Sequence, residues 1–169
     1  MNPLTFREIP ETDSRQLCTL IDVVIASLER PEYFIPFADW EYEQFFDATY
    51  GAIHGAYDGA RLVGMSQLYF SERLICDSRV ILGLRQSECC ELGGNLVLPE
   101  YRGRGIMFAL GSIQVQEARA LGFRDVFALA HPDNVGSVSS LLKLGFLFSG
   151  LHAMSDVYVR NFYRLRLAR

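Results

Sequence analysis

The spacing of apolar residues changes along the chain, and each change marks an expected element. Near the start the apolar residues follow a helical spacing, at Leu17, Leu20, Ile21, Val24 and Leu28. We predict a helix that buries this stripe, is capped by Thr12 or Asp13, and is broken by the prolines at 31 and 36. A short strand over residues 5–9 is expected before it.

Residues 50–57 and 61–70 are two runs with strand-like composition. They flank Asp58-Gly59, a dipeptide typical of tight hairpin turns, so we predict an antiparallel hairpin. The next segment, 71–86, mixes short apolar runs with arginines. Its pattern leaves two interpretations open, an extension of the flanking strands or a loop over a binding site.

The run from Ser87 to Leu98 predicts a central strand, although Gly93 and Gly94 interrupt it. Paired glycines often mark a bulge or the close approach of another backbone. A flexible defect is the less attractive interpretation, because it would leave buried amides without partners. We therefore expect either a bulge or the close approach of another backbone at these glycines.

Beyond residue 98 the period becomes helical again. The expected order is a helix over 105–121 ended by Gly122, a buried strand over 125–130, a helix over 135–144, a return strand from Phe146, and a last strand over 156–167. This order predicts a mixed α/β (α+β) fold.

Length and composition limit the possible classes of protein. With 169 residues the chain can bury one substantial core, so we expect a single domain over residues 1–169. Half of the residues are apolar, which excludes a disordered chain, and the net charge of −4 argues against a nucleic-acid partner. The first ten residues lack the apolar centre of a signal peptide, and the apolar stretch 17–28 is too short to cross a bilayer. We expect a cytoplasmic protein with no membrane partner.

Cysteine and histidine are few and scattered. The four cysteines are Cys18, Cys76, Cys89 and Cys90. They form no Cys-x-x-Cys pair and have no histidine nearby at the spacing of metal ligands. We interpret them as reduced thiols in the core. No metal site is expected.

A basic, glycine-bearing turn joins the central strand to the helix that begins near residue 105. Gly103 and Gly105 let the backbone turn tightly and bring its amides close to a ligand. The first amides of a helix lack partners and lie at the positive end of the helix dipole. With Arg102 and Arg104 adding charge, the turn predicts a cradle for a pyrophosphate.

Two motifs in this half of the chain carry a family resemblance. The pattern Val97-x-Pro99-x-x-Arg102-Gly103-x-Gly105-Ile106 resembles the acyl-CoA-binding motif of the GNAT (general N-acetyltransferase) superfamily. The segment Asn134-x-x-Ser137, with Lys143-Leu-Gly145-Phe146 after it, resembles the second signature of the same family. The last position of the first motif is Met107, where the family has Gly or Ala.

The resemblance implies a GNAT fold, with a central mixed twisted sheet of about six to seven strands, helices on both faces, and a central strand splayed from its neighbour. It also implies acetyl-CoA as the acyl donor. The pantetheine arm would pair with the backbone of Val97 and Leu98 in the gap between strands. The other implied cofactor-binding residues are Arg102, Gly103, Arg104, Gly105, Ile106, Met107, Asn134 and Ser137.

Acyl transfer to an amine needs a base, and Glu88 and Glu91 on the central strand are the candidates. Glu91 lies six residues before Val97, the position that resembles the general-base glutamate of histone acetyltransferases and ribosomal-protein amino-terminal acetyltransferases, so we predict Glu91. Its alternative role is a strand-end acid that faces solvent or pairs with arginine. Leu141 occupies the position of the family's usual tyrosine acid.

The aromatic and acidic segment 32–47 has two interpretations. It forms a helix whose aromatic side chains pack on the sheet, or part of it lines the acceptor site with carboxylates suited to an amine. Together these features predict an acetyl-CoA-dependent N-acetyltransferase that acts on a primary amine of a small molecule or peptide. A homodimer is compatible with this prediction. The alternatives are a non-catalytic acyl-CoA-binding module and an enzyme for a longer acyl-CoA.

Overall fold

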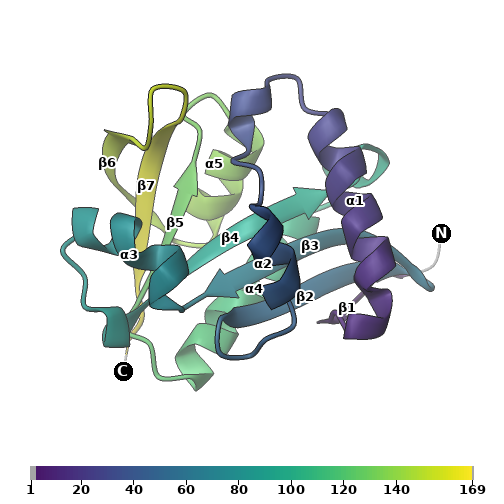
Figure 1. The fold of residues 1–169 in the computed structure, drawn as a ribbon, viewed down its shortest axis with the longest axis horizontal. Helices are drawn as coiled ribbons and strands as arrows, with labels where there is room; N and C mark the ends of the chain where they lie inside the picture. Colours follow the sequence, from purple (N-terminus) through teal and green to yellow (C-terminus); the bar gives the residue numbers. More distant parts are fainter. Residues whose placement is uncertain (1–2, 169) are drawn as a thin grey trace.

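Seven strands form one sheet in the order β1-β2-β3-β4-β5-β7-β6 in the computed structural model, which describes residues 3–168 (Figure 1). The strands are β1 (Thr5–Glu8), β2 (Gly51–Asp58), β3 (Arg61–Tyr69), β4 (Cys89–Val97), β5 (Asp125–Ala130), β6 (Leu147–Ala153) and β7 (Val159–Arg166). The helices are α1 (Ser14–Ala26), α2 (Asp39–Gln44), α3 (Glu72–Ile81), α4 (Ile106–Ala120) and α5 (Val135–Lys143).

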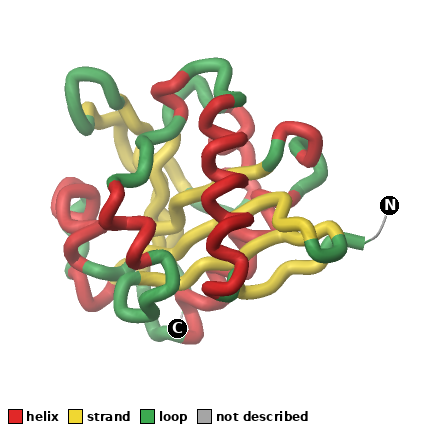
Figure 2. The backbone as a smooth tube through the Cα atoms, turned by 45° about the vertical axis from the view of Figure 1, so that its right-hand side comes forward, coloured by secondary structure: helices red, strands yellow, loops and turns green. Residues whose placement is uncertain are grey.

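The sheet is mixed, as predicted. Only β4 and β5 pair in parallel, and the other neighbours are antiparallel. The predicted hairpin is confirmed, since β2 and β3 pair directly across the Asp58-Gly59 turn. Helices α1, α2 and α3 cover one face of the twisted sheet, and α4 lies behind it (Figures 1 and 2).

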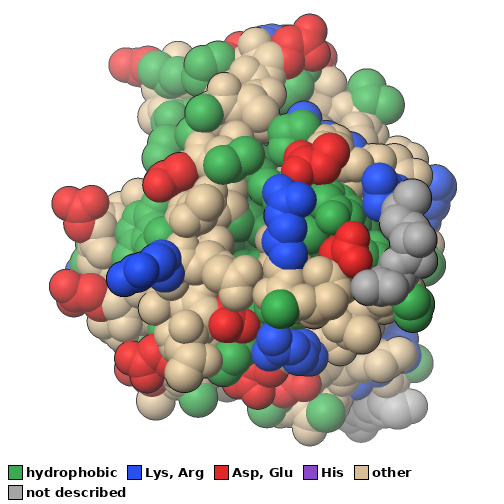
Figure 3. Space-filling view, turned by 90° about the vertical axis from the view of Figure 1, so that its right-hand side faces the viewer, with side chains coloured by type: hydrophobic (Ala, Val, Ile, Leu, Met, Phe, Trp, Pro, Cys, Tyr) green, Lys and Arg blue, Asp and Glu red, His purple; other side chains and the backbone are tan. Residues whose placement is uncertain are grey.

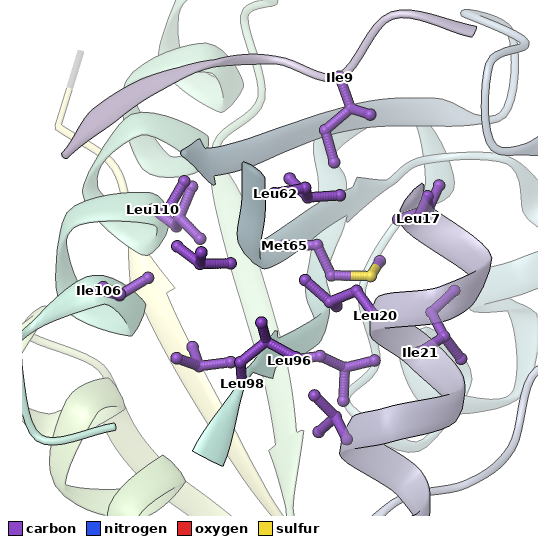
Figure 4. Packing of buried hydrophobic residues seen from close by; sticks show 14 of the residues in the cluster. Ile9, Leu17, Leu20, Ile21, Leu62, Met65, Leu96, Leu98, Ile106 and Leu110 are labelled. Carbon is purple, nitrogen blue, oxygen red and sulfur yellow. The ribbon is translucent and has the colours of Figure 1, made fainter. Parts of the chain in front are cut away.

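The largest core cluster fills the space between α1, the sheet and α4 (Figure 4). The predicted stripe of α1 is confirmed, because Leu17, Leu20, Ile21 and Val24 are buried there. Burying each of these side chains contributes about 2 kcal/mol, so the stripe holds α1 on the sheet. Asp13 occupies the N-cap position of α1, as predicted, but its carboxylate accepts from Tyr57 and Arg7 and makes no capping hydrogen bond.

Strand β4 is bulged and then separates from β5. Its pairing with β3 shifts register between Met65 and Gln67, beside Gly94, whose φ of +57° favours glycine. Pairing with β5 stops after Glu91, although β4 continues to Val97. The two arrows diverge toward their carboxyl ends in Figure 1, so the predicted bulge and splay are both confirmed.

Segment 71–86 contains α3, which neither interpretation of its pattern predicted. Ile75 and Ser78 are buried on one side of the helix, and Ile75 packs with Phe127 of the sheet. Arg79 pairs with Glu72 along the helix. The short apolar runs suggested strands or a loop, whereas the helix turns only one residue of each run toward the sheet, so its period is hidden in the sequence.

The surface carries charges of both signs. On the face that Figure 3 shows, basic and acidic side chains are interspersed, and neither sign forms a continuous patch. The interpretation of the cysteines as core thiols holds for Cys89 and Cys90, while Cys18 is exposed because it lies on the outer side of α1. No helix among residues 3–168 is long and apolar enough to span a membrane.

Candidate active site

A groove of about 510 Å³ opens where β4 leaves β5. Its floor is the β4 bulge from Leu92 to Val97, and one wall is the turn that leads into α4. The opposite wall is the start of α5, and the connection between α1 and α2 reaches the groove through Leu28, Tyr33 and Phe34. The splay therefore produces a groove that is lined by elements from both faces of the sheet.

The turn before α4 has the geometry of an anion cradle. Gly103 and Gly105 both have φ of +74°, and nothing lies within 4 Å of where a Cβ would be. Within the described chain, the backbone amides of Gly103, Gly105, Ile106 and Met107 have no protein acceptor. These four residues line the groove, so their amides are available to a phosphate group.

The two arginines of the turn differ in position. Arg102 lines the groove, and it donates from Nε to the Val97 carbonyl at 3.4 Å and from Nη2 to Ser27 Oγ at 2.9 Å. Arg104 donates to the Glu100 carbonyl at 3.0 Å and lies over the Tyr101 ring. Within the described part of the chain, the groove wall includes Arg102 and not Arg104. The prediction that both arginines add charge to the cradle is thus corrected for the Arg104 side chain.

The backbone groups of Val97 and Leu98 differ in whether they are available to a ligand. The Leu98 amide donates to the Val63 carbonyl at 3.0 Å, and its side chain is in the core (Figure 4), so the expectation that Leu98 offers a free group is wrong. Successive residues of an antiparallel strand direct their amides to opposite sides. The N–H and C=O of Val97 therefore point toward the gap beside β5.

The start of α5 completes the groove. Asn134 accepts a hydrogen bond from the Ser137 amide at 3.2 Å and so caps the helix, while both residues line the groove. Leu141 also lines it and is buried. An apolar side chain therefore faces the groove where the resemblance had suggested a tyrosine.

The two candidate bases have different environments. Glu88 pairs with Arg85 and Arg124, which is the role of a strand-end acid. Glu91 lies opposite Tyr69 of β3 and Phe127 of β5, on the face covered by α1, α2 and α3. Burial raises the pKa of Glu91 to about 8, with a smaller contribution from the negative charge of Glu41.

Glu91 is next to the bulge. A Cβ added to Gly93 would lie 3.5 Å from Glu91 Oε1 and 2.7 Å from the Tyr69 ring. The Tyr69 hydroxyl donates to Gln67 Oε1 at 2.5 Å, and burial raises the pKa of Tyr69 well above its usual value. The carboxyl of Glu91 is thus held between the bulge and an un-ionised tyrosine.

The structure of segment 32–47 agrees in part with each of the two interpretations of its sequence. Phe45 is buried in the core, and Asp39 and Glu43 face solvent, as expected for a helix that packs on the sheet. Glu41 is half-buried, and burial raises its pKa. With Tyr69, it lines a pocket of about 10 Å³, the size of one water molecule.

Sequence reasoning missed Tyr69 and did not single out Glu41. Tyr69 ends a strand, where an aromatic residue is ordinary by pattern, and only the pairing of β3 with β4 brings it to Glu91. Among the described residues, no group of three His, Cys, Asp or Glu side chains could hold a metal ion.

A groove with free amides at a helix start, formed where a sheet splits, with a partly buried carboxylate beside the bulge, is typical of a group-transfer enzyme with a phosphate-bearing donor. The chain belongs to the acetyltransferase (GNAT) family, whose model matches residues 23–146. It is therefore an acyltransferase, and the donor of this family is acetyl-CoA. None of the curated proteins matches the sequence.

Solved structures share the fold at low identity. An N-acetyltransferase from Staphylococcus aureus Mu50 has 17% identity and a TM-score of 0.75, covering 98% of this chain and 99% of its own. The ribosomal-protein-S18-alanine N-acetyltransferase of Escherichia coli has 12% identity and a TM-score of 0.72, covering 99% and 96%. A phosphinothricin acetyltransferase from Sinorhizobium meliloti, solved with acetyl-CoA, has 19% identity and a TM-score of 0.73, covering 97% and 88%. At these identities the likeness shows the fold alone.

Proposed function

We propose that this enzyme transfers the acetyl group of acetyl-CoA directly to a primary amine of a small molecule or peptide, with Glu91 as the general base. The observation that carries the proposal is the position of Glu91. Its carboxyl lies beside the β4 bulge, where the sheet opens, and burial raises its pKa to about 8. A base whose pKa lies near the working pH transfers protons most efficiently.

Acetyl-CoA fits the groove in one direction. Its diphosphate would accept from the amides of Gly103, Gly105, Ile106 and Met107, and Arg102 would add positive charge. The pantetheine arm would then follow β4 and pair with Val97, while Asn134 and Ser137 would contact it from the start of α5. This order brings the thioester to the bulge.

The chemistry follows from these positions. Glu91 removes a proton from the acceptor ammonium, and the free amine attacks the thioester carbonyl carbon. A backbone amide of the β4 bulge would donate to the oxyanion that forms. When the tetrahedral intermediate collapses, the carbon–sulfur bond breaks, CoA leaves as a thiolate, and the nitrogen gives up its second proton to solvent, which leaves a neutral amide. Leu141 offers no proton, so the thiolate takes one from solvent, which is feasible because thiols ionise near pH 8.5.

The acceptor site is on the face of Glu91. Trp40, Glu41 and Tyr50 lie around the water-sized pocket beside Tyr69, where Arg73 already covers the Trp40 ring at 3.7 Å, so Glu41 is the group there that would attract an amine. The fold also occurs in a protein named for acetylation of a ribosomal-protein alanine and in one named for phosphinothricin. A small-molecule or peptide amine is consistent with both.

Release of free CoA with a panel of amines tests this function. We expect acetyl-CoA to bind, CoA release to depend on the amine, and Glu91→Gln to lower turnover while it leaves acetyl-CoA affinity nearly unchanged. Glu88→Gln, in the turn immediately before β4, is the matched control and should keep its activity. Binding without transfer to any amine, with either acetyl-CoA or a longer acyl-CoA, would contradict the proposal.

A further inference from the structure

Arg160 of β7 is a buried cation without a counter-ion. Only 3% of the residue is exposed, and its Nη1 donates to the Val159 carbonyl at 2.8 Å. Its Nη2 is buried and has no partner among residues 3–168. The carboxylate that influences it, Glu32, is already bound by Arg30 at 2.7 Å.

Arg164, four residues along the same strand, differs from Arg160 because its charge is paired with a carboxylate. Arg164 donates from Nε to Asp125 at 2.8 Å, although more of its side chain is exposed. An arginine stays protonated when buried, and burying its charge without an anion costs several kcal/mol. The more buried of the two arginines is therefore the one that lacks an anion.

Arg160 and Glu91 lie on the same face of the sheet. Glu91 is opposite Phe127, and Phe127 is opposite Arg164. Because side chains alternate along a strand, Arg164, Phe162 and Arg160 project to one side. Phe162 is opposite Leu129, which lines the groove, so this row leads from the base past the groove to Arg160.

The side chains beside Arg160 in the sheet and in the turn before β7 are a histidine and a tyrosine, and neither is an anion. His152 is the direct neighbour of Arg160 on β6, and the Arg160 guanidinium lies over the Tyr158 ring at 5.4 Å. The connection between α1 and α2 covers this end of β5, since Tyr33 packs on His131 at 5.2 Å between ring centres. In Figure 1 this connection reaches over the top of the sheet toward α5.

We propose that Arg160 binds a carboxylate of the acceptor, so that the acceptor carries both an amine for Glu91 and an anionic group for Arg160. This inference rests on the proposed function for the position of the amine. The strand register puts the two Cα atoms about 16 Å apart, from roughly 3.3 Å per residue and 4.8 Å between strands. That separation suits an amine several bonds from its carboxylate, as in a diamino acid or a short peptide.

Matched acids and carboxamides test the proposal. Lysine, ornithine, Gly-Gly and Ala-Ala are assayed as free acids and as their carboxamides, by CoA release and by calorimetric titration into CoA-saturated protein. We expect the free acids to be preferred by about 100-fold in kcat/KM, as for charge-assisted hydrogen bonds, and Arg160→Met to bring that ratio close to one. The diamino acids and the dipeptides distinguish the two sources of the carboxylate.

Thermal unfolding without ligand tests the same idea independently of acetyl transfer. Arg160→Met should raise the Tm by about 5 °C because it removes an unpaired buried charge. Arg164→Met, the control, should lower the Tm, because it leaves Asp125 unpaired, and should keep the preference for acids. Arg160→Lys should retain part of that preference.

Three results would overturn the proposal: a fall in Tm for Arg160→Met, equal use of acids and carboxamides by the wild type, or an acid preference that survives Arg160→Met. If none of these probes is acetylated, the amine panel described above decides the proposed function, while the calorimetric preference for acids and the Tm of Arg160→Met still decide the role of Arg160.

Discussion

Glu91 and Tyr69 are directly opposed residues of β4 and β3, and they project to the same face of the sheet. The tyrosine hydroxyl donates to Gln67 and keeps its proton, because burial and the charges of Glu91 and Glu41 raise its pKa. The pair places a buried carboxyl beside a neutral ring at the point where the sheet divides. Activity, stability and donor binding should all depend on this arrangement or on the cradle next to it.

The pH profile of kcat/KM should follow the ionisation of Glu91. The pKa of Glu91 is raised to about 8, and only the carboxylate can act as a base. Activity should therefore rise about tenfold per pH unit below pH 8 and level off above it. Glu91→Gln should lower kcat by about 10²–10⁴ and remove this limb of the profile. A Glu91→Gln profile with the same limb would contradict the assignment.

The same ionisation should make stability depend on pH. The folded protein holds the Glu91 proton more tightly than the unfolded chain, so this stabilisation is present at low pH and is lost as the pH rises from about 4.5 through 8. Urea unfolding should find wild type and Glu91→Gln nearly equal at pH 5. At pH 9 the variant should be more stable by about 2 kcal/mol, less than the full shift implies because the Glu91 residue is partly exposed to solvent.

Gly94→Ala should damage the site more than a comparable change elsewhere. Its φ is +57°, and a Cβ there would lie 2.5 Å from Gln67 Oε1 and 2.8 Å from the Tyr69 hydroxyl. Gly59 in the hairpin is the matched control, with φ of +61° and no atom within 4 Å of the Cβ position.

Gly59→Ala should lose about 1 kcal/mol, the cost of the left-handed conformation. Gly94→Ala should lose about 2–4 kcal/mol and most of its turnover, because the Tyr69–Gln67 hydrogen bond must move. Denaturant unfolding and steady-state kinetics measure both effects. Equal losses in the two variants would show that the contact with Tyr69 is unimportant.

Arg102→Gln should weaken acetyl-CoA binding more than Arg104→Gln. Arg102 lines the groove, and the Arg104 side chain turns toward Glu100 and Tyr101. Calorimetry should find about a tenfold loss of affinity for Arg102→Gln, reduced at high salt, and little change for Arg104→Gln. The reverse order would mean that the diphosphate lies on the other side of the turn.

Local pattern was enough for much of the fold. The stripe of α1, the hairpin turn at Asp58-Gly59 and the glycine turn before α4 each involve residues that are close in the chain, so spacing and backbone preference predict them. The bulge at Gly93 and Gly94 was also predictable, because glycine weakens a regular strand and is therefore typical of bulges and close backbone contacts.

The sequence by itself determined the donor half of this protein: a strand, a basic glycine turn and a helix whose first amides are free. Tertiary structure decided the rest. Only the pairing of strands shows that the Leu98 amide is occupied by Val63, that Tyr69 meets Glu91, and that β7 presents Arg160 to the same face. These relationships join residues far apart in the chain, and they depend on register and burial, which no local pattern encodes.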